Sequence, residues 1–105
     1  MGGVDLQKAT RENVRWYILR ALNAARPEGA SESIVLSALQ GIPIDITQKE
    51  LRRELDYLEA RDLIEVEGRK TPVWYAKTNR DGIDVVEYTV ECHPGIARPE
   101  KWWDD

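Results

Sequence analysis

Apolar residues in the first quarter of the chain recur at helical spacing. One stripe is formed by Val14, Ile18, Ala21, Leu22 and Ala25. Thr10 precedes this stripe as an N-cap residue, and Pro27 follows it as a helix breaker. The pattern therefore predicts a helix over residues 10–26, preceded by a flexible lead-in over residues 1–9, for which a partly helical start from Asp5 stays open.

The next apolar stripe is shorter. It predicts a helix that Ser31 caps and that ends near Gln40, where Gly41 and Pro43 prevent continuation. The apolar turn over residues 41–46 is expected to fill the angle between this helix and the next one.

A third helix carries the most complete local signals. Thr47 and Glu50 form the S/T-x-x-E capping box that marks a helix start. Leu51, Leu55 and Leu58 then repeat at helical spacing and predict a buried stripe. The helix is expected to run directly into a strand.

An alternation with a period of two follows this helix. Residues 63–67 place apolar and acidic side chains in turn, which is typical of a half-buried strand. Residues 68–72 form a turn that contains the basic residues Arg69 and Lys70, and residues 73–76 return as a second strand. The pattern predicts a β-hairpin with a basic tip.

The last part of the chain gives a less uniform pattern. Thr78 can cap a helix that continues to about Glu91, although the β-favouring residues over 84–91 leave a strand open. Residues 92–105 contain turn formers and two tryptophans, and they are expected to form a tail that packs on the domain or on a partner subunit. The chain is thus predicted to form one domain over residues 10–91, mainly α with a small antiparallel β-hairpin, an α+β fold.

This order of elements resembles the winged helix-turn-helix (winged-helix) DNA-binding superfamily, and the resemblance covers residues 10–91. Residues 51–64 look like the family's recognition helix running into the first wing strand, and residues 75–82 are similar to the segment that leads into its last helix. Asp62 stands where such sequences often have glycine, which implies a slightly different helix exit. The tail over residues 94–103 resembles that of small winged-helix proteins from Mu-like prophages.

The resemblance implies that the third helix enters the DNA major groove. The residues expected at the DNA are Thr47, Gln48, Lys49, Arg52, Arg53, Asp56, Arg69 and Lys70. Arginine on the helix would pair with guanine, and the basic residues of the hairpin tip would contact phosphate or the minor groove. A different interpretation is that Arg52 and Asp56, at i,i+4, simply steady a solvated helix face. Asp56 would also repel a phosphate.

Charge weakens the DNA hypothesis without removing it. The formal net charge of the chain is −4. Residues 47–80 contain eight basic and seven acidic residues, whereas residues 81–105 contain two basic and seven acidic ones. The acidity therefore lies in the last quarter. The weakly basic balance of the third helix and hairpin leaves open a winged-helix module that binds protein.

Two pairs of large apolar residues fall outside the predicted core stripes. Trp16 and Leu19 lie on the opposite side of the first helix from its stripe, and Trp102 and Trp103 stand near the chain end. Tryptophan side chains in a solvated tail would leave a large apolar area exposed to water and would not stabilise the fold. These four residues are therefore expected either to pack together within the chain or to form an interface with a partner subunit.

Other kinds of chemistry find little support in the sequence. A single cysteine, Cys92, excludes an internal disulfide and indicates a reducing, cytoplasmic setting. Cys92 and His93 are adjacent but have no further Cys or His as partner, so no metal site is expected. No glycine-rich phosphate loop, catalytic motif, signal peptide or membrane-spanning run is present. We therefore expect no cofactor, no enzymatic activity and no membrane partner.

The sequence thus favours a sequence-specific DNA-binding protein, a small transcriptional regulator of phage or prophage origin. A homodimer on double-stranded DNA is expected, because one small module buries limited surface and two half-sites would compensate. The alternative is a winged-helix protein-interaction module that serves as an assembly or accessory component.

Overall fold

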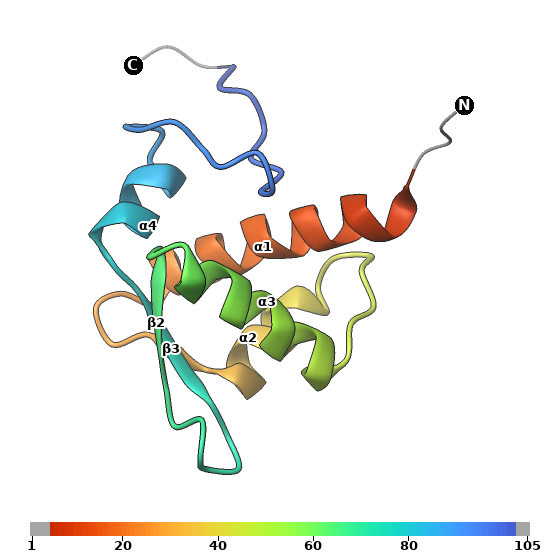
Figure 1. Cartoon of the computed structure of the whole chain (residues 1–105), viewed down its shortest axis with the longest axis vertical. Coiled ribbons are helices and arrows are strands. Elements are labelled where there is room, and N and C mark those ends of the chain that lie inside the picture. Colours follow the sequence, from red (N-terminus) through yellow and green to blue (C-terminus); the bar gives the residue numbers. More distant parts are fainter. Residues whose placement is uncertain (1–4, 103–105) are drawn as a thin grey trace.

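A computed structural model describes residues 5–102 of the chain (Figure 1). Its elements in chain order are α1 (Leu6–Ala24), β1 (Ala30–Ser31), α2 (Glu32–Leu39), α3 (Gln48–Ala60), β2 (Ile64–Glu67), β3 (Tyr75–Thr78) and α4 (Arg80–Val86). We call β2, β3 and the intervening residues 68–74 the wing. The predicted class, mainly α with a small antiparallel β-hairpin in an α+β fold, is confirmed.

The first helix begins earlier than the sequence predicts. Asp5 is the N-cap residue, and its side chain accepts a hydrogen bond from the Lys8 backbone N–H at 3.0 Å. Thr10 lies inside the helix, where its hydroxyl donates to the carbonyl of Leu6 at 2.7 Å. The predicted start at Thr10 is therefore wrong, because a suitable cap residue stands five positions upstream. Residues 6–9 belong to the helix, and residues 1–4 lie outside the described part.

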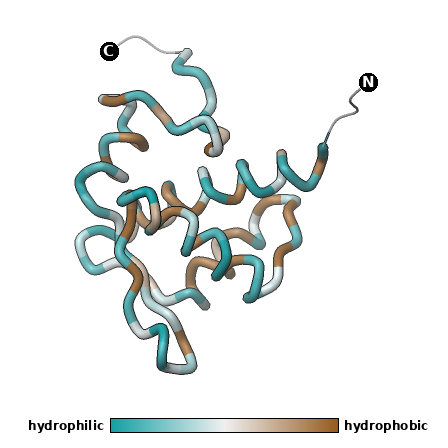
Figure 2. The backbone as a smooth tube through the Cα atoms, in the orientation of Figure 1, coloured by the Kyte–Doolittle hydropathy of each residue, from teal (hydrophilic) through white to brown (hydrophobic). Residues whose placement is uncertain are grey.

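Because α1 lies at the centre of the fold, side chains outside its predicted apolar stripe are also buried. α2, α3, α4 and β3 all pack against it. Val14, Ile18 and Leu22 of the stripe are buried as predicted, and so are Trp16 and Leu19 on the other side of the helix. Hydrophobic and hydrophilic positions follow one another along the helices, as the colours in Figure 2 show.

The second and third helices are capped as predicted. The Ser31 side chain accepts from the Ile34 N–H at the start of α2. At the start of α3, the Thr47 hydroxyl accepts from the Glu50 N–H at 3.1 Å, and the Glu50 carboxylate accepts from the Thr47 N–H at 2.8 Å. The leucine stripe of α3 is fully buried. Between the helices, Ile42, Ile44 and Ile46 pack against the core.

The exit from α3 uses a left-handed residue that is not glycine. Asp62 has a φ of 60°. Its N–H donates to the Glu59 carbonyl at 2.9 Å, and the Leu63 N–H donates to the Leu58 carbonyl at 3.1 Å. These two bonds form a Schellman motif. The implied difference in helix exit is therefore wrong, since Asp62 adopts the conformation that glycine usually supplies.

The sheet has three antiparallel strands in the order β1-β3-β2, one more than predicted. β3 begins at Tyr75, which pairs with Glu67, so the turn between the wing strands is two residues longer than predicted. β1 pairs Ala30 with Ala76 and Ser31 with Tyr75. The sequence did not reveal β1, because two residues are too few to show a periodic pattern.

The chain after β3 departs most from prediction. Asn79 caps α4 in place of Thr78, accepting from the Gly82 N–H at 2.9 Å, and the helix ends at Val86. The alternative of a strand over residues 84–91 is also wrong, because its first three residues are helical and the next four are turns and bends.

The tail after α4 folds back along α1, on the side away from the wing (Figure 1). Ile96 is buried there, and the Ala97 N–H donates to the Glu12 carbonyl at 3.0 Å. These contacts anchor the tail on the middle of α1. Across residues 5–102, no helix combines the length and the apolar character needed to cross a membrane.

Candidate nucleic-acid interface

The outward side of α3 presents two basic residues. Because Leu51, Leu55 and Leu58 face the core, Lys49 and Arg53 fall on the opposite side and are exposed, one helical turn apart. Neither side chain forms a hydrogen bond or ion pair with another residue in the described range 5–102. Thr47 and Gln48 are also exposed at the start of the same helix. This side of α3 can therefore meet an anionic partner.

Arg52 is engaged within the protein instead. Its Nε donates to Glu32 Oε1 at 2.8 Å and its Nη2 to Glu32 Oε2 at 2.7 Å, a bidentate pair. Nη2 also donates to the Pro72 carbonyl at 3.0 Å, and the guanidinium lies over the Trp74 ring, 4.7 Å from its centre. The predicted i,i+4 pair of Arg52 with Asp56 is not formed. Arg52 ties α3 to α2 and the wing.

Glu32 is the buried centre of this junction. It is 2% exposed, and its Oε2 also accepts from the Trp74 N–H at 2.6 Å. The hydrogen bonds from Arg52 hold the pKa of Glu32 below its usual value against the opposing effect of burial, and the Trp74 N–H lowers it further. No local sequence pattern indicates this pairing, since Glu32 and Arg52 are twenty positions apart.

Arg69 turns back from the wing onto α3. Its guanidinium pairs with both Asp56 and Glu59, and it lies over the Trp74 ring at 4.6 Å. The hydrogen bonds that Arg69 donates to these two carboxylates raise its pKa, the one to Asp56 most strongly. Asp56 is thereby neutralised on the outward face of α3. Of the two basic wing residues expected at DNA, the structure leaves only Lys70 without such a pairing.

The other flank of α3 is fixed to α1 and the tail. Arg15 of α1 donates from Nε to the buried carboxylate of Glu54 at 2.7 Å and from Nη1 to the Gly95 carbonyl at 2.8 Å. The guanidiniums of Arg15 and Arg61 lie 3.5 and 3.4 Å from the centre of the Tyr57 ring. Sequence reasoning missed this cluster. A glutamate at position 54, between buried leucine positions, was the available signal.

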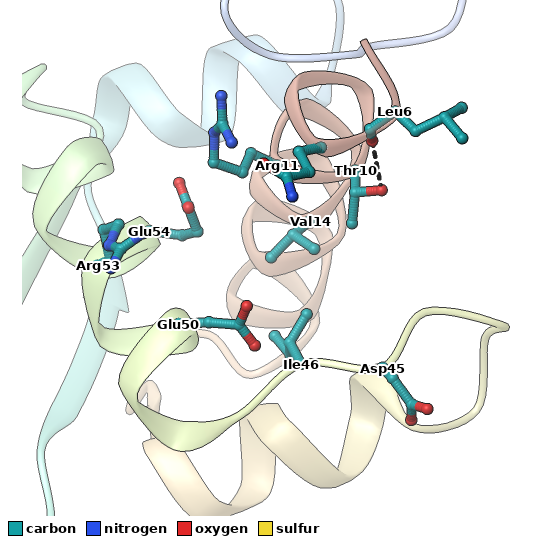
Figure 3. A pocket seen from close by; sticks show the side chains of 10 residues that line it. Leu6, Thr10, Arg11, Val14, Asp45, Ile46, Glu50, Arg53 and Glu54 are labelled. Atoms are coloured by element: carbon teal, nitrogen blue, oxygen red, sulfur yellow. Dashed lines mark hydrogen bonds between the residues drawn. The ribbon is translucent and has the colours of Figure 1, made fainter.

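A cleft of about 310 Å³ opens between the start of α1, the turn before α3 and α3 itself (Figure 3). Val14 and Ile46 contribute apolar side chains to it. Its charged side chains include guanidiniums, from Arg11 and Arg53, and carboxylates, such as that of Glu54. Because both signs of charge are present, electrostatics alone selects no class of ligand for this cleft.

The four residues expected to form an interface separate into different environments. Trp16 is 6% exposed and stacks edge-on against Tyr88 with ring centres 6.1 Å apart, and Leu19 is fully buried. The chain itself thus covers both side chains. Trp102 is 85% exposed, and Trp103 lies outside the described residues.

The Cys92–His93 pair stands in the tail. Cys92 is half-buried, and burial raises the pKa of its thiol. Within the part of the chain that the structure describes, no three His, Cys, Asp or Glu residues gather closely enough to hold a metal ion.

Comparison with known proteins gives a structural likeness only. No protein-family model matches the chain, and no curated protein sequence does either. The structure of the S. aureus MepR–DNA complex aligns with a TM-score of 0.60 and 24% identity, covering 80% of this chain and 71% of that one. A candidate DNA-binding protein from Ralstonia eutropha JMP134 aligns with a TM-score of 0.58 and 18% identity, covering 85% and 100%. This likeness, together with the element order and the wing, shows that the chain has a winged-helix fold.

Proposed function

We propose that this protein binds double-stranded DNA through α3 and the wing and that it acts in the cytoplasm as a sequence-specific transcriptional regulator. α3 would enter the major groove with Lys49 and Arg53 toward the bases and phosphates. Lys70 on the wing would contact the backbone beside it. The tail's resemblance to Mu-like prophage proteins supports a phage or prophage setting.

The observation that carries this proposal is the charge on the outward side of α3. Lys49 and Arg53 are exposed there, while the negative charge of Asp56 beside them is balanced by Arg69. Apart from Asp56, this side of the helix thus carries two exposed cations against one exposed carboxylate, that of Glu50 near Arg53, so it has a local positive excess although the chain as a whole is acidic. An α-helix fits the DNA major groove, and the phosphate oxygens of the DNA backbone are the anions that this side of α3 would contact.

The structural neighbours support the same assignment. The MepR structure is a complex with DNA, and it shares the fold of this chain over most of the described length. Both neighbours carry a DNA-binding description, whereas neither is described as an assembly component. These likenesses favour DNA over a protein partner for the outward side of α3.

We further propose that the protein acts as a homodimer. One module of this size buries limited surface on DNA, and two copies on adjacent half-sites would combine their contacts. The tail, to which the exposed Trp102 belongs, runs on the side of α1 away from the wing (Figure 1), so a partner bound to the tail would leave both copies of α3 accessible. Analytical ultracentrifugation would give the oligomeric state.

The proposal predicts DNA affinity that falls steeply with salt. Binding to a random-sequence duplex would be measured at several salt concentrations for the wild type and for Lys49→Ala/Arg53→Ala. The double variant should bind more weakly, and its log–log salt slope should be smaller by about 0.9 for each phosphate that it no longer neutralises. Arg53→Ala alone should also change the sequence preference if Arg53 reads a base.

The matched control is Arg20→Ala/Arg80→Ala, which removes two exposed arginines from α1 and α4. This variant has the same net charge as the test variant and should bind almost as well as the wild type. Absence of wild-type binding at low salt would refute the proposal. Equal losses in the two double variants would show that α3 is not the binding surface.

A further inference from the structure

We propose that Arg69 is a positioning residue that clamps the wing to α3, and that it does not bind DNA phosphate itself. This inference rests on the proposed DNA-binding function, and it assigns distinct roles to the two basic residues of the wing turn. Arg69 would fix the position of the wing relative to α3, and Lys70 would contact the DNA phosphate.

The clamp is built around one aromatic ring. The guanidiniums of Arg52 and Arg69 lie 4.7 and 4.6 Å from the centre of the Trp74 ring. Each guanidinium is held at its other side by carboxylates: Arg52 by Glu32 of α2, and Arg69 by two acidic residues of α3. Charge-assisted hydrogen bonds and stacking thus join three elements through Trp74.

The acidic partners of Arg69 are themselves anchored in α3. Glu59 accepts from the Val66 N–H of β2 at 2.8 Å through the oxygen that Arg69 does not use. Asp56 lies one turn nearer the start of α3. Arg69 therefore spans a helical turn of α3 from a position in the wing turn, which fixes the distance between the wing and the helix.

The same contacts make Arg69 a poor phosphate ligand. Binding a phosphate would require it to release two carboxylates, and those carboxylates would then face the DNA with uncompensated negative charge. Lys70 is exposed next to it and forms no ion pair within residues 5–102. Phosphate contact by Lys70 carries no such cost.

Arg69→Lys separates the two roles because it keeps the charge and removes the planar fork. A lysine binds phosphate as a point charge, but it cannot pair with two carboxylates and stack on Trp74 at once. If Arg69 positions the wing, Arg69→Lys should weaken DNA binding about as much as Arg69→Ala, roughly fivefold, with the salt slope unchanged in the lysine variant. Lys70→Ala is the matched comparison, and its salt slope should fall by about 0.9.

Amide hydrogen exchange of the free protein provides a readout that needs no DNA. The Val66 N–H bonds to Glu59, and the Thr71 N–H bonds to the Gly68 carbonyl at 2.9 Å inside the wing turn. Both amides should exchange faster in Arg69→Lys than in the wild type, and Lys70→Ala should leave them unchanged.

Three results would overturn the inference. The first is wild-type affinity for Arg69→Lys together with a lowered salt slope for Arg69→Ala, since this is the signature of a phosphate ligand. The second is wild-type affinity for both variants, and the third is unchanged wing exchange in Arg69→Lys. A wild type that fails to bind any DNA would instead refute the proposed function, and the exchange experiment would still test the clamp.

Discussion

At the scale of single residues, the decisive features are side chains whose partners are distant in sequence. Arg52 and Arg69 are basic residues of the kind that contacts DNA, and the sequence predicts that role for both. Their carboxylate partners stand ten to twenty positions away, so no local rule could pair them. Lys49 and Arg53, in contrast, could be placed correctly from helical periodicity alone, because the leucine stripe fixes which side of α3 faces out.

Glu32 should make the stability of the fold depend on acid pH. Its pKa is lowered in the folded protein from a usual value of 4.5. A carboxyl of this kind stabilises the fold above its unfolded pKa, and that contribution is lost as the pH falls through the folded pKa. Urea unfolding of the wild type should therefore show stability declining below about pH 5.

Glu32→Gln isolates this contribution. The variant should lose on the order of 1–3 kcal/mol of unfolding free energy near neutral pH, because the charge-assisted hydrogen bonds to Arg52 are lost. Its stability should also vary less than that of the wild type between about pH 6 and about pH 3, which is roughly the range in which carboxyl groups titrate. Glu65→Gln, which removes an exposed carboxylate from β2, should change stability little at either pH. A parallel decline of wild type and Glu32→Gln would contradict this role of Glu32.

At the scale of elements, strong local sequence signals predicted the positions of the helices, whereas weaker signals gave wrong helix ends. The capping box of α3 was predicted to the residue because Thr47 and Glu50 satisfy each other within four positions. The N-cap of α1 was predicted at Thr10, whereas Asp5, five positions upstream, caps the helix. β1 could not be predicted, because its pairing with β3 arises from tertiary contact between segments some forty-five residues apart.

The junction between α3 and β2 gives a test at this scale. Asp62 holds a φ of 60°, a conformation that glycine adopts without strain and that alanine resists. Asp62→Gly should raise the free energy of unfolding by about 0.5–1 kcal/mol, whereas Asp62→Ala should lower it. Denaturant midpoints of the two variants provide the measurement. A more stable alanine variant would mean that the Asp62 side chain, and not its backbone conformation, determines stability here.

At the scale of the whole molecule, the excess of negative charge is confined to the last quarter of the sequence. Within that quarter, residues 81–91, which include most of α4, contain four acidic and no basic residues, and the tail after α4 runs along α1 on the side away from the wing (Figure 1). The outward side of α3 is hydrophilic, as Figure 2 shows, and displays Lys49 and Arg53. A net acidic chain can therefore offer DNA a locally basic surface, since charges beyond about 8–10 Å are largely screened at physiological salt.

The central claim is that DNA meets α3 and the wing. The most direct test is a titration of the isotope-labelled protein with a duplex, followed by backbone amide chemical shifts. We expect the largest changes within residues 47–56 and at Lys70, with little change in the tail residues 92–99. Changes confined to the tail and the outer side of α1, or no saturable change at low salt, would contradict it.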